Sequence, residues 1–292
     1  MIGAGAMGGA TVEGLVNTGL YKSEDICVSD PSQAVLDKFV KMGVSVTTDN
    51  AAAAAVADVV MVCVKPWLVK PVLQGIQAAL DPQRQLLVVI AAGVKSADVQ
   101  QLLGSQCPPL FLCIPNIAIA QLQSMTFLVP CTAAYAPSAP ASAPTSAPAS
   151  APVSAPASAP ASAPVSRAAV SPQQTATVKT IFDAMGQTLI TDEQHLPSGT
   201  TLASCGIAYA MRYIRAAAEG GVEMGFRADD AKRIVMQTIK GAVAVLEASG
   251  LHPEAAIDLV TTPGGVTIKG LNEMEHAGFT SAVIRGLKAG LK

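Results

Sequence analysis

Hydrophobic and polar positions divide the chain into two halves with different periodicities. In the first half, stretches with helical spacing or high alanine content alternate with short apolar runs, at Ile26–Ser29, Val59–Val64, Leu86–Ala91 and Leu110–Ile114. Such runs have the length and the Val, Ile and Leu content of strands that are buried on both faces. The alternation therefore predicts a parallel sheet that is covered by helices on both faces. A further strand is expected at Leu189–Thr191, after a helix-like stretch at Thr175–Met185.

From about Thr200 the pattern changes to a period of 3.6 residues, with few strand signals. Between Cys205 and Phe226, one helix face carries apolar residues and another carries charged ones; the apolar set is Ile207, Met211, Ile214, Ala218 and Val222. A second helix is expected from about Ala228 to Ser249, because Gly250 is well placed as its C-cap. The pattern predicts an all-helical second half.

Residues 137–166 repeat serine, alanine and proline, and contain no charge and no side chain larger than valine. Such a composition cannot bury enough apolar surface to offset the entropy of ordering. We expect a tolerated, disordered insertion at residues 136–168, a mixture of polyproline II and coil. It would separate a strand-like segment at Thr126–Pro130 from a helix that begins near Ser171.

Charge and apolar content exclude several classes of partner. The 19 basic and 21 acidic residues give a net charge of −2 without a Lys/Arg cluster, which argues against nucleic acid and anionic membranes as partners. The longest apolar runs fall below the roughly 20 residues that a membrane span needs. The first 21 residues contain no Lys or Arg, so the basic start of a secretory signal is missing.

The six cysteines form no CxxC pair, and four of them lie in apolar strand-like runs. This usage is typical of buried thiols in a reducing compartment, so a cytoplasmic location is expected. The three histidines, His195, His252 and His276, have no metal-ligand spacing, and no metal site is predicted.

Gly3-Ala4-Gly5-Ala6-Met7-Gly8 is a GxGxxG motif in a favourable context, because a helix-like stretch and then a strand ending at Asp30 follow it. In a nucleotide-binding unit, the first glycine permits a tight turn and the second lets the backbone approach the pyrophosphate. The third glycine allows close packing of the helix on the strand. The motif therefore predicts a dinucleotide site.

Asp30 stands where a carboxylate would accept a hydrogen bond from the ribose 2′-hydroxyl and repel a 2′-phosphate, which favours NADH over NADPH modestly. Ser29 and Ser32 could instead receive a phosphate. The alternative is that Asp30-Pro31-Ser32 only makes a turn.

Only Met1 and Ile2 precede the glycine motif, although the central strand of the sheet is expected there. One interpretation is that the chain as given begins several residues late. The other is that this domain is weakened.

Three segments follow predicted strands and therefore lie at the carboxyl edge of the sheet, where ligands of open parallel sheets collect: Val64-Lys65-Pro66, Ala91-Ala92-Gly93 and Ile114-Pro115-Asn116. A fourth segment, Pro263-Gly264-Gly265, precedes a predicted helix. Its unpaired N–H groups and the helix dipole suit a carboxylate, with the Thr267 hydroxyl beside them. The alternative is an ordinary turn and N-cap.

At these residues the chain resembles the pyrroline-5-carboxylate reductase family. The resemblance rests on GAGAMG at the start, VKP at 64–66, AAG at 91–93, IPN at 114–116 and TTPGGVTIKGLNEMEHAGFTSAVIRGL at 261–287. It implies an α/β fold, with a Rossmann dinucleotide-binding domain at residues 1–192 and an all-helical substrate and dimerisation domain at 193–292. The helical domain would interlock two subunits.

The resemblance also implies roles for individual residues. The pyrophosphate turn would comprise Gly3, Ala4, Gly5, Ala6 and Met7. Asp30 and Ser32 would lie near the adenosine ribose, and along the rest of the cofactor would lie Asn50, Val64, Lys65, Pro66 and, near the nicotinamide, Ala92. On the substrate side, Val266 and Thr267 match the binding segment, and Glu193 stands where some members have an acidic residue.

Some positions depart from the family pattern. The usual GSGPAY-like stretch reads Ser204-Cys205-Gly206-Ile207-Ala208-Tyr209 and lacks the proline, and the usual MPNTP reads IPNIA at 114–118. These variations affect a helix entry and the pocket lining, so they bear on substrate detail more than on reaction type.

The leading hypothesis is reduction of 1-pyrroline-5-carboxylate to L-proline, with NADP or NAD as cofactor. Backbone N–H groups around Gly264, Gly265 and Val266 would hold the substrate carboxylate, and the Thr267 hydroxyl would contact the ring nitrogen as the catalytic group. No general acid is evident, so solvent or an already protonated imine would supply the proton.

Two alternatives stay open. One is another Rossmann oxidoreductase that acts on an imine or hydroxy acid, with Lys232 or Lys240 as the poised base. The other is a dimeric dinucleotide-binding scaffold without catalysis, which the short first strand and the tract would support.

Overall fold

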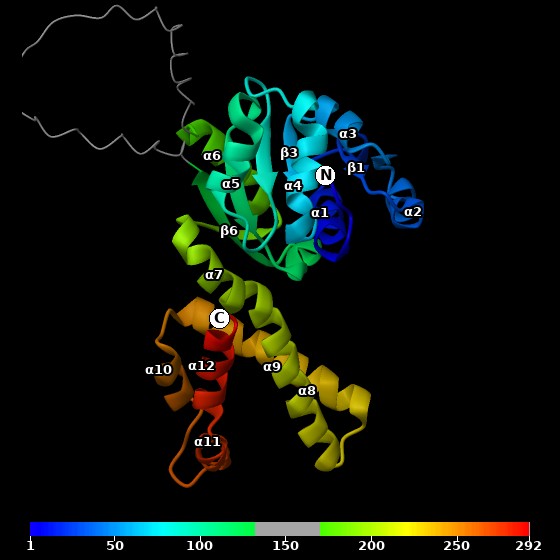
Figure 1. Ribbon diagram of the computed structural model, residues 1–292. Helices are drawn as coiled ribbons and strands as arrows, with labels where there is room; N and C mark the ends of the chain where they lie inside the picture. Colours follow the sequence, from blue (N-terminus) through cyan, green and yellow to red (C-terminus); the bar gives the residue numbers. More distant parts are fainter. Residues whose placement is uncertain (132–169, 292) are drawn as a thin grey trace, which may run out of the picture.

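The computed structural model describes residues 1–131 and 170–291, and its first part is a layered α/β domain (Figure 1). The strands are β1 (Cys27–Ser29), β2 (Ser45–Thr47), β3 (Val59–Val62), β4 (Leu86–Val89), β5 (Leu110–Ile114), β6 (Ser124–Cys131) and β7 (Gly186–Ile190). They form a pair β1-β2 and a five-stranded sheet in the order β3-β4-β5-β6-β7. The expected strand positions agree with these bounds within a few residues, and β2 is an addition that the apolar pattern did not show.

Ile2 joins the two groups of strands. It makes parallel bridges to Ser29 in β1 and to Val62 in β3, and its N–H group donates to the Met61 carbonyl at 2.8 Å. Only 2% of Ile2 is exposed, so this one residue fills the central place in the sheet between β1 and β3.

The predicted parallel pairing is confirmed for β1 to β5, whereas β6 runs in the opposite direction. β6 pairs with β5 in the antiparallel sense, with Ile114 opposite Phe127. A parallel neighbour would need a crossover of a dozen or more residues, whereas only a short 3-10 helix (η4, Ile117–Gln121) and Leu122 in the left-handed conformation separate β5 from the turn into β6. The remaining pairings, including β6 with β7, are parallel.

Helices cover both faces of the sheet, as expected. On one face lie α1 (Ala6–Asn17), α2 (Gln33–Val40) and α6 (Pro172–Asp183), packed over Phe111; on the other lie α3 (Asn50–Val56), α4 (Pro66–Ile76) and α5 (Ser96–Leu103), packed over Leu87. Buried side chains on the two faces form two separate apolar clusters. This doubly wound core holds the carboxyl ends of the strands at one edge of the domain.

The Ser/Ala/Pro tract lies outside the described residues, and its expected disorder stays a prediction. The structure does describe its neighbours. β6 ends at Cys131, and α6 begins at Pro172 with a capping box, in which the Ser171 hydroxyl accepts from the Gln174 N–H at 3.2 Å and the Gln174 side chain accepts from the Ser171 N–H at 2.8 Å.

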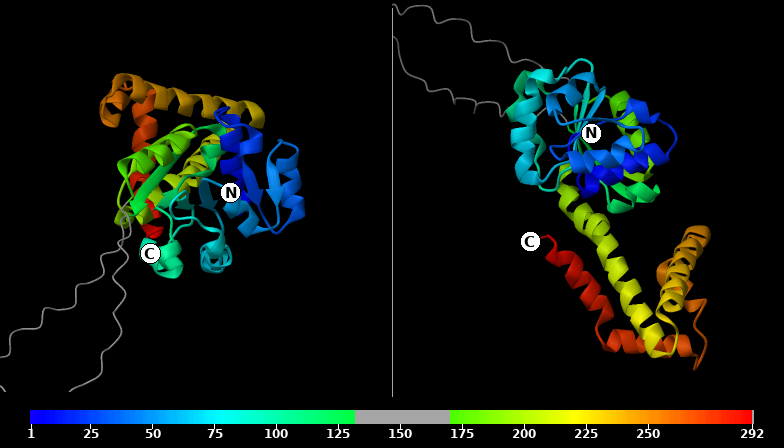
Figure 2. Two further views of the ribbon diagram at one scale, coloured as in Figure 1. Left: turned by 90° about the horizontal axis from the view of Figure 1, so that it is seen from above. Right: turned by 90° about the vertical axis from the view of Figure 1, so that its right-hand side faces the viewer.

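From Glu193 onward the described chain is helical (Figures 1 and 2). Its helices are α7 (Leu196–Gly199), a π-helix at Thr200–Cys205, α8 (Gly206–Glu223), α9 (Ala228–Ser249), α10 (Pro253–Asp258), α11 (Val266–His276) and α12 (Phe279–Ala289). Short 3-10 turns occur at Ser23–Asp25, Gln77–Ala79, Gly104–Gln106 and Glu193–His195. α9 has the bounds that its pattern predicts, and Gly250 ends it in the left-handed conformation, with φ of 63°.

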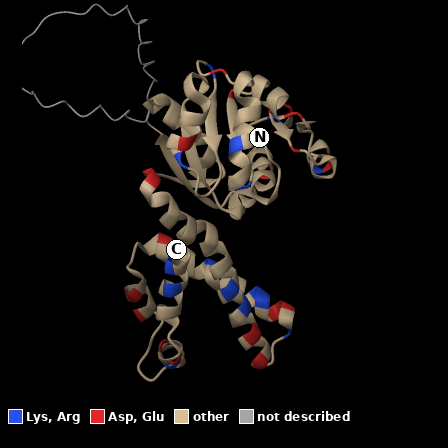
Figure 3. Ribbon diagram, viewed as in Figure 1, with Lys and Arg blue, Asp and Glu red and all other residues tan. Residues whose placement is uncertain are grey.

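The helices after the π-helix bury almost nothing within one chain. Between residues 206 and 291, only Gly221 and Ala231 are buried, at the crossing of α8 and α9. The apolar face predicted for α8 is therefore open, with Met211 59% exposed and Val222 46% exposed. Figure 3 shows that both acidic and basic residues occur along α8 and α9. Large apolar faces on a single copy indicate a surface that another molecule covers.

Two further features are the character of the helices and the burial of the cysteines. Within residues 1–131 and 170–291, no helix combines the length and apolar character that crossing a bilayer requires. Cys63, Cys113 and Cys131 are buried thiols of the sheet, as their apolar runs predict.

Candidate active site

A cleft of about 670 Å³ runs along the carboxyl edge of the sheet. Its lining includes most of the residues that the sequence assigns to the cofactor: Gly3, Gly5, Ala6, Met7, Asp30, Asn50, Val64, Lys65, Pro66 and Ala92. Ala4 and Ser32 do not line it, although both donate backbone hydrogen bonds to Asp30. We call this hollow the cofactor cleft. Its position at the topological switch point is where doubly wound sheets bind nucleotides.

The glycine turn has the backbone geometry that the GxGxxG motif predicts. Gly3 has φ of +90°, and a Cβ atom there would lie 2.3 Å from the Cys63 carbonyl oxygen. A Cβ atom on Gly8 would lie 2.0 Å from the Gly3 carbonyl oxygen, whereas one on Gly5 would meet no atom within 4 Å. Gly5 is the N-cap of α1 and supplies no side-chain cap, so the first N–H groups of this helix stay available to a pyrophosphate.

The Asp30 carboxylate serves the turn and also faces the cleft. Oδ2 accepts from the Ala4 N–H at 3.0 Å, and Oδ1 accepts from the Ser32 N–H at 3.0 Å. Each oxygen keeps a lone pair, so these bonds leave capacity for a ribose hydroxyl. Both interpretations from the sequence, the turn and the ribose contact, therefore fit one geometry.

Two other groups define the wall of the cofactor cleft. Asn50, the first residue of α3, accepts from the buried Ser29 hydroxyl at 2.7 Å through Oδ1, which leaves its amide N–H groups as donors. Cys63 also lines the cleft, and burial raises the pKa of its thiol to about 12. This thiol stays protonated at neutral pH, so it is unsuited to act as a nucleophile.

A second cleft, of about 630 Å³, continues from the cofactor cleft at the exits of β4 and β5. The two hollows share Ala91, Ala92, Ile114 and Thr200 in their linings. Asp30 follows β1, whereas Ala91, Ala92 and Ile114 lie at the exits of β4 and β5, so Ile2 and β3 separate the two places along the sheet. A dinucleotide with its adenosine ribose at Asp30 would therefore place its nicotinamide where the second cleft opens.

Glu193 lines the second cleft, where the resemblance places an acidic residue near the substrate. Its Oε1 accepts from the Ser96 N–H at 3.0 Å, and its Oε2 accepts from the Ser96 hydroxyl. Ser96 is the first residue of α5, so the carboxylate also meets the positive end of that helix. These bonds fix the start of the helical half against the sheet.

Sequence reasoning missed Ser96, Thr200 and Ser204. Thr200 lines both clefts, and the Ser204 hydroxyl donates to the Pro115 carbonyl at 2.7 Å, which ties the π-helix to the exit of β5. π-Helical turns frequently occur at functional sites. Ser204 lies in the stretch that departs from the family's GSGPAY pattern, and that departure was the available signal.

The segment from Gly264 to Thr267 does not line either cleft of its own chain. It forms the entry to α11, with Gly264 at φ of 70° and Gly265 as an N-cap without a side-chain cap. Val266 is 86% exposed. α11 lies at the end of the helical part that is remote from the Rossmann domain (Figures 1 and 2).

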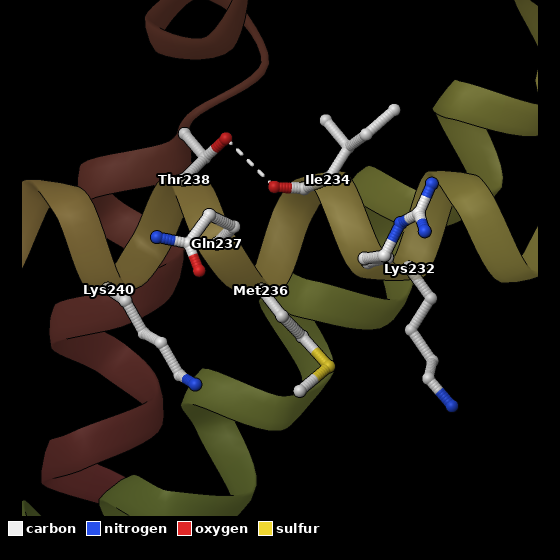
Figure 4. Close-up of a pocket in the computed structure, with 7 residues that line it drawn as sticks. Lys232, Ile234, Met236, Gln237, Thr238 and Lys240 are labelled. Carbon is white, nitrogen blue, oxygen red and sulfur yellow. Dashed lines mark hydrogen bonds between the residues drawn. The ribbon is translucent and has the colours of Figure 1, made fainter.

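The two candidate bases of the alternative enzyme, Lys232 and Lys240, lie on α9 (Figure 4). They line a hollow of about 790 Å³ whose wall consists of α9 residues alone, among them Met236 (Figure 4). That hollow shares no residue with the cofactor cleft. In the described chain the two lysines are therefore not poised at a nicotinamide.

A dinucleotide-binding turn and a cleft at the strand exits, followed by an open helical domain, together define a Rossmann oxidoreductase with an appended helical domain. Family models match both parts. Residues 193–292 match "pyrroline-5-carboxylate reductase dimerisation", and residues 1–93 match "NADP oxidoreductase coenzyme F420-dependent".

Individual relatives agree. The chain is 31% identical to pyrroline-5-carboxylate reductase 2 of Dictyostelium discoideum over 98% of this chain and 88% of that protein. It is 30% identical to the pyrroline-5-carboxylate reductase of Methanosarcina acetivorans, over 97% and 93%. With pyrroline-5-carboxylate reductase 1 of D. discoideum the identity is 34%, and the chain spans 47% of that longer protein. The chain belongs to the pyrroline-5-carboxylate reductase family.

Solved structures share the fold. The pyrroline-5-carboxylate reductase of Streptococcus pyogenes superposes with a TM-score of 0.76 at 25% identity, covering 99% of this chain and 95% of that one. The Plasmodium falciparum pyrroline carboxylate reductase with NADP bound gives 0.78 at 22% identity, covering 99% and 94%.

Proposed function

We propose that the chain catalyses the NAD(P)H-dependent reduction of 1-pyrroline-5-carboxylate to L-proline. The observation that carries this proposal is the second cleft, which opens from the nicotinamide end of the cofactor cleft and provides room for a small ring. Family membership supports the choice of substrate.

The residues of the cofactor cleft fit a dinucleotide. The first N–H groups of α1 would bind the pyrophosphate, Asp30 and the Asn50 amide would bind the adenosine ribose, and Lys65 would face the phosphates. Val64, Pro66 and Ala92 would line the cofactor by contact. When bound, the dinucleotide supplies the hydride, and the protein contributes orientation and electrostatics.

We place the substrate groups of the helical domain in a second copy. Gly264, Gly265, Val266 and Thr267 are exposed or half-buried and remote from the cleft of their own chain, and the helices around them leave apolar faces open. Docking of two copies through these faces would bring each segment to the other copy's second cleft. There the backbone N–H groups would hold the carboxylate, and the Thr267 hydroxyl would contact the ring nitrogen.

Glu193 would face the substrate from the same chain as the cofactor. Its carboxylate accepts two hydrogen bonds from Ser96, so it is held in place within the second cleft. A fixed negative charge there favours the protonated imine, which is the better hydride acceptor. The proton donor would be solvent, or the imine would bind already protonated.

We also propose a cytoplasmic location. Cys63, Cys113 and Cys131 are buried thiols, which suits a reducing compartment.

The direct test measures proline-dependent reduction of NAD(P)⁺ at high pH by the purified full chain. The proposal predicts turnover with L-proline and none with hydroxy acids. Turnover with a hydroxy acid alone would favour the other oxidoreductase, and dinucleotide binding without any turnover would favour the scaffold.

A separate prediction concerns cofactor preference. Asp30→Ser is expected to shift the ratio of kcat/KM towards NADPH, because a carboxylate repels a 2′-phosphate and a serine can donate to it. Asp30→Asn is the control, because it keeps an acceptor for the Ala4 N–H and removes the charge. If the ratio of kcat/KM for the two cofactors were unchanged in both variants, Asp30 would stabilise the turn without contacting the ribose.

A further inference from the structure

The second cleft contains one side chain of each charge, Lys95 and Glu193. Its other lining groups are apolar or uncharged. The substrate of the proposed reaction is itself a zwitterion when its imine is protonated, with a carboxylate next to the ring nitrogen. The pair of charges in the cleft therefore has the signs that such a ligand requires.

Lys95 is available to a ligand. It is the N-cap residue of α5, it is exposed, and among residues 1–131 and 170–291 no carboxylate lies within the 4.0 Å of an ion pair with it. The other lysine of the two clefts, Lys65, lines the cofactor cleft. Lys95 is thus the basic side chain that the second cleft offers to an anion.

Glu193 does not form an ion pair with Lys95. Its two oxygens accept from the N–H and the hydroxyl of Ser96, at the positive end of α5. Its bonding partners are thus groups of the α5 start, which leaves the Lys95 ammonium free of a carboxylate partner. An incoming carboxylate would meet the Lys95 ammonium, and the imine nitrogen would meet the fixed Glu193 carboxylate, because both side chains line the second cleft.

We infer that Lys95 is a substrate-binding residue whose ammonium group pairs with the substrate carboxylate in the second cleft. This inference rests on the proposed function and assigns to the cofactor-bearing chain a contact that complements the backbone N–H groups of the second copy. A carboxylate has about four acceptor positions, so it accommodates both sets of donors.

The test compares two substrates that differ only in the carboxylate. With the full-length protein at saturating NADPH, Lys95→Gln is expected to lower kcat/KM for 1-pyrroline-5-carboxylate by about tenfold or more, mainly through KM, as for the loss of a hydrogen bond between charged groups. For 1-pyrroline, which has no carboxylate, the change is expected to stay within about twofold. Lys95→Arg is expected to restore most of the lost efficiency.

Lys70→Gln is the matched control, because Lys70 is an exposed lysine outside both clefts, and it should leave both substrates unaffected. Equal losses for the two substrates, or no loss for either, would overturn the role of Lys95 while the proposed function stands. Failure of the wild-type protein to reduce either substrate would overturn the proposed function. In that case calorimetry compares the binding of L-proline with that of pyrrolidine, which has no carboxylate. Tighter binding of L-proline that is lost in Lys95→Gln supports the role of Lys95. Tighter binding that persists in Lys95→Gln overturns that role.

Discussion

Gly8→Ala is expected to lower the melting temperature and abolish dinucleotide binding together. The new Cβ atom would lie 2.0 Å from the Gly3 carbonyl oxygen, and backbone atoms cannot move aside as a flexible side chain would. Overpacking typically lowers the free energy of unfolding by about 1–3 kcal/mol, and a contact with backbone atoms this close should cost at least the upper value. At about 2–4 °C for each kcal/mol, the melting temperature should fall by roughly 6–12 °C. Calorimetry and NADPH titration measure the two effects.

Gly5→Ala separates folding from binding in the same turn. A Cβ atom on Gly5 meets no protein atom within 4 Å, and its backbone has φ of −63°, so the melting temperature should hold. The methyl group would nevertheless stand in the cofactor cleft where the pyrophosphate approaches. Each lost hydrogen bond to a charged phosphate weakens NADPH binding by about 10-fold to 150-fold. If Gly5→Ala bound NADPH with wild-type affinity, the pyrophosphate would not bind at this turn.

Thr267→Val is expected to lower kcat/KM for 1-pyrroline-5-carboxylate by roughly 10-fold to 150-fold, the effect of one lost hydrogen bond to a charge-developing group. Thr267 is exposed, so the isosteric change should spare the fold. NADPH affinity should hardly move, because the residue lies outside the cofactor cleft. Thr267→Ser retains the hydroxyl and is the control. Wild-type kinetics in Thr267→Val would remove this hydroxyl from the mechanism.

The same variant tests whether the substrate segment comes from a second copy. A dimer of one Gly5→Ala chain and one Thr267→Val chain would contain one site with both defects and one with neither. Mixing the two variants under conditions that exchange subunits should then restore about a quarter of wild-type activity, as random pairing gives. If Thr267 served its own chain's cleft, each site of the mixed dimer would keep one defect and no activity would return.

The sequence was sufficient for features that local patterns encode. Buried strands appear as apolar runs, the glycine turn follows from φ and close approach at Gly3 and Gly8, and the end of α9 follows from the left-handed preference of Gly250. Each of these depends on a few neighbouring residues, so no tertiary information was needed. The antiparallel direction of β6 was missed because it depends on the length of the connection after β5 and on which edge of the sheet is free.

The tertiary structure decided which of the predicted groups share a site. It joined Glu193 to Ser96 across 97 positions of sequence, tied Ser204 to Pro115, and placed Lys95 in the lining of the second cleft. It also showed that Gly264–Thr267 lie away from the cleft of their own chain, although the segment carries the family signature. Such pairings depend on how separate elements pack, and no spacing along the chain encodes that packing. The sequence by itself determined which ligand-binding groups the chain carries, whereas the packing of its elements decided which of them share a cleft.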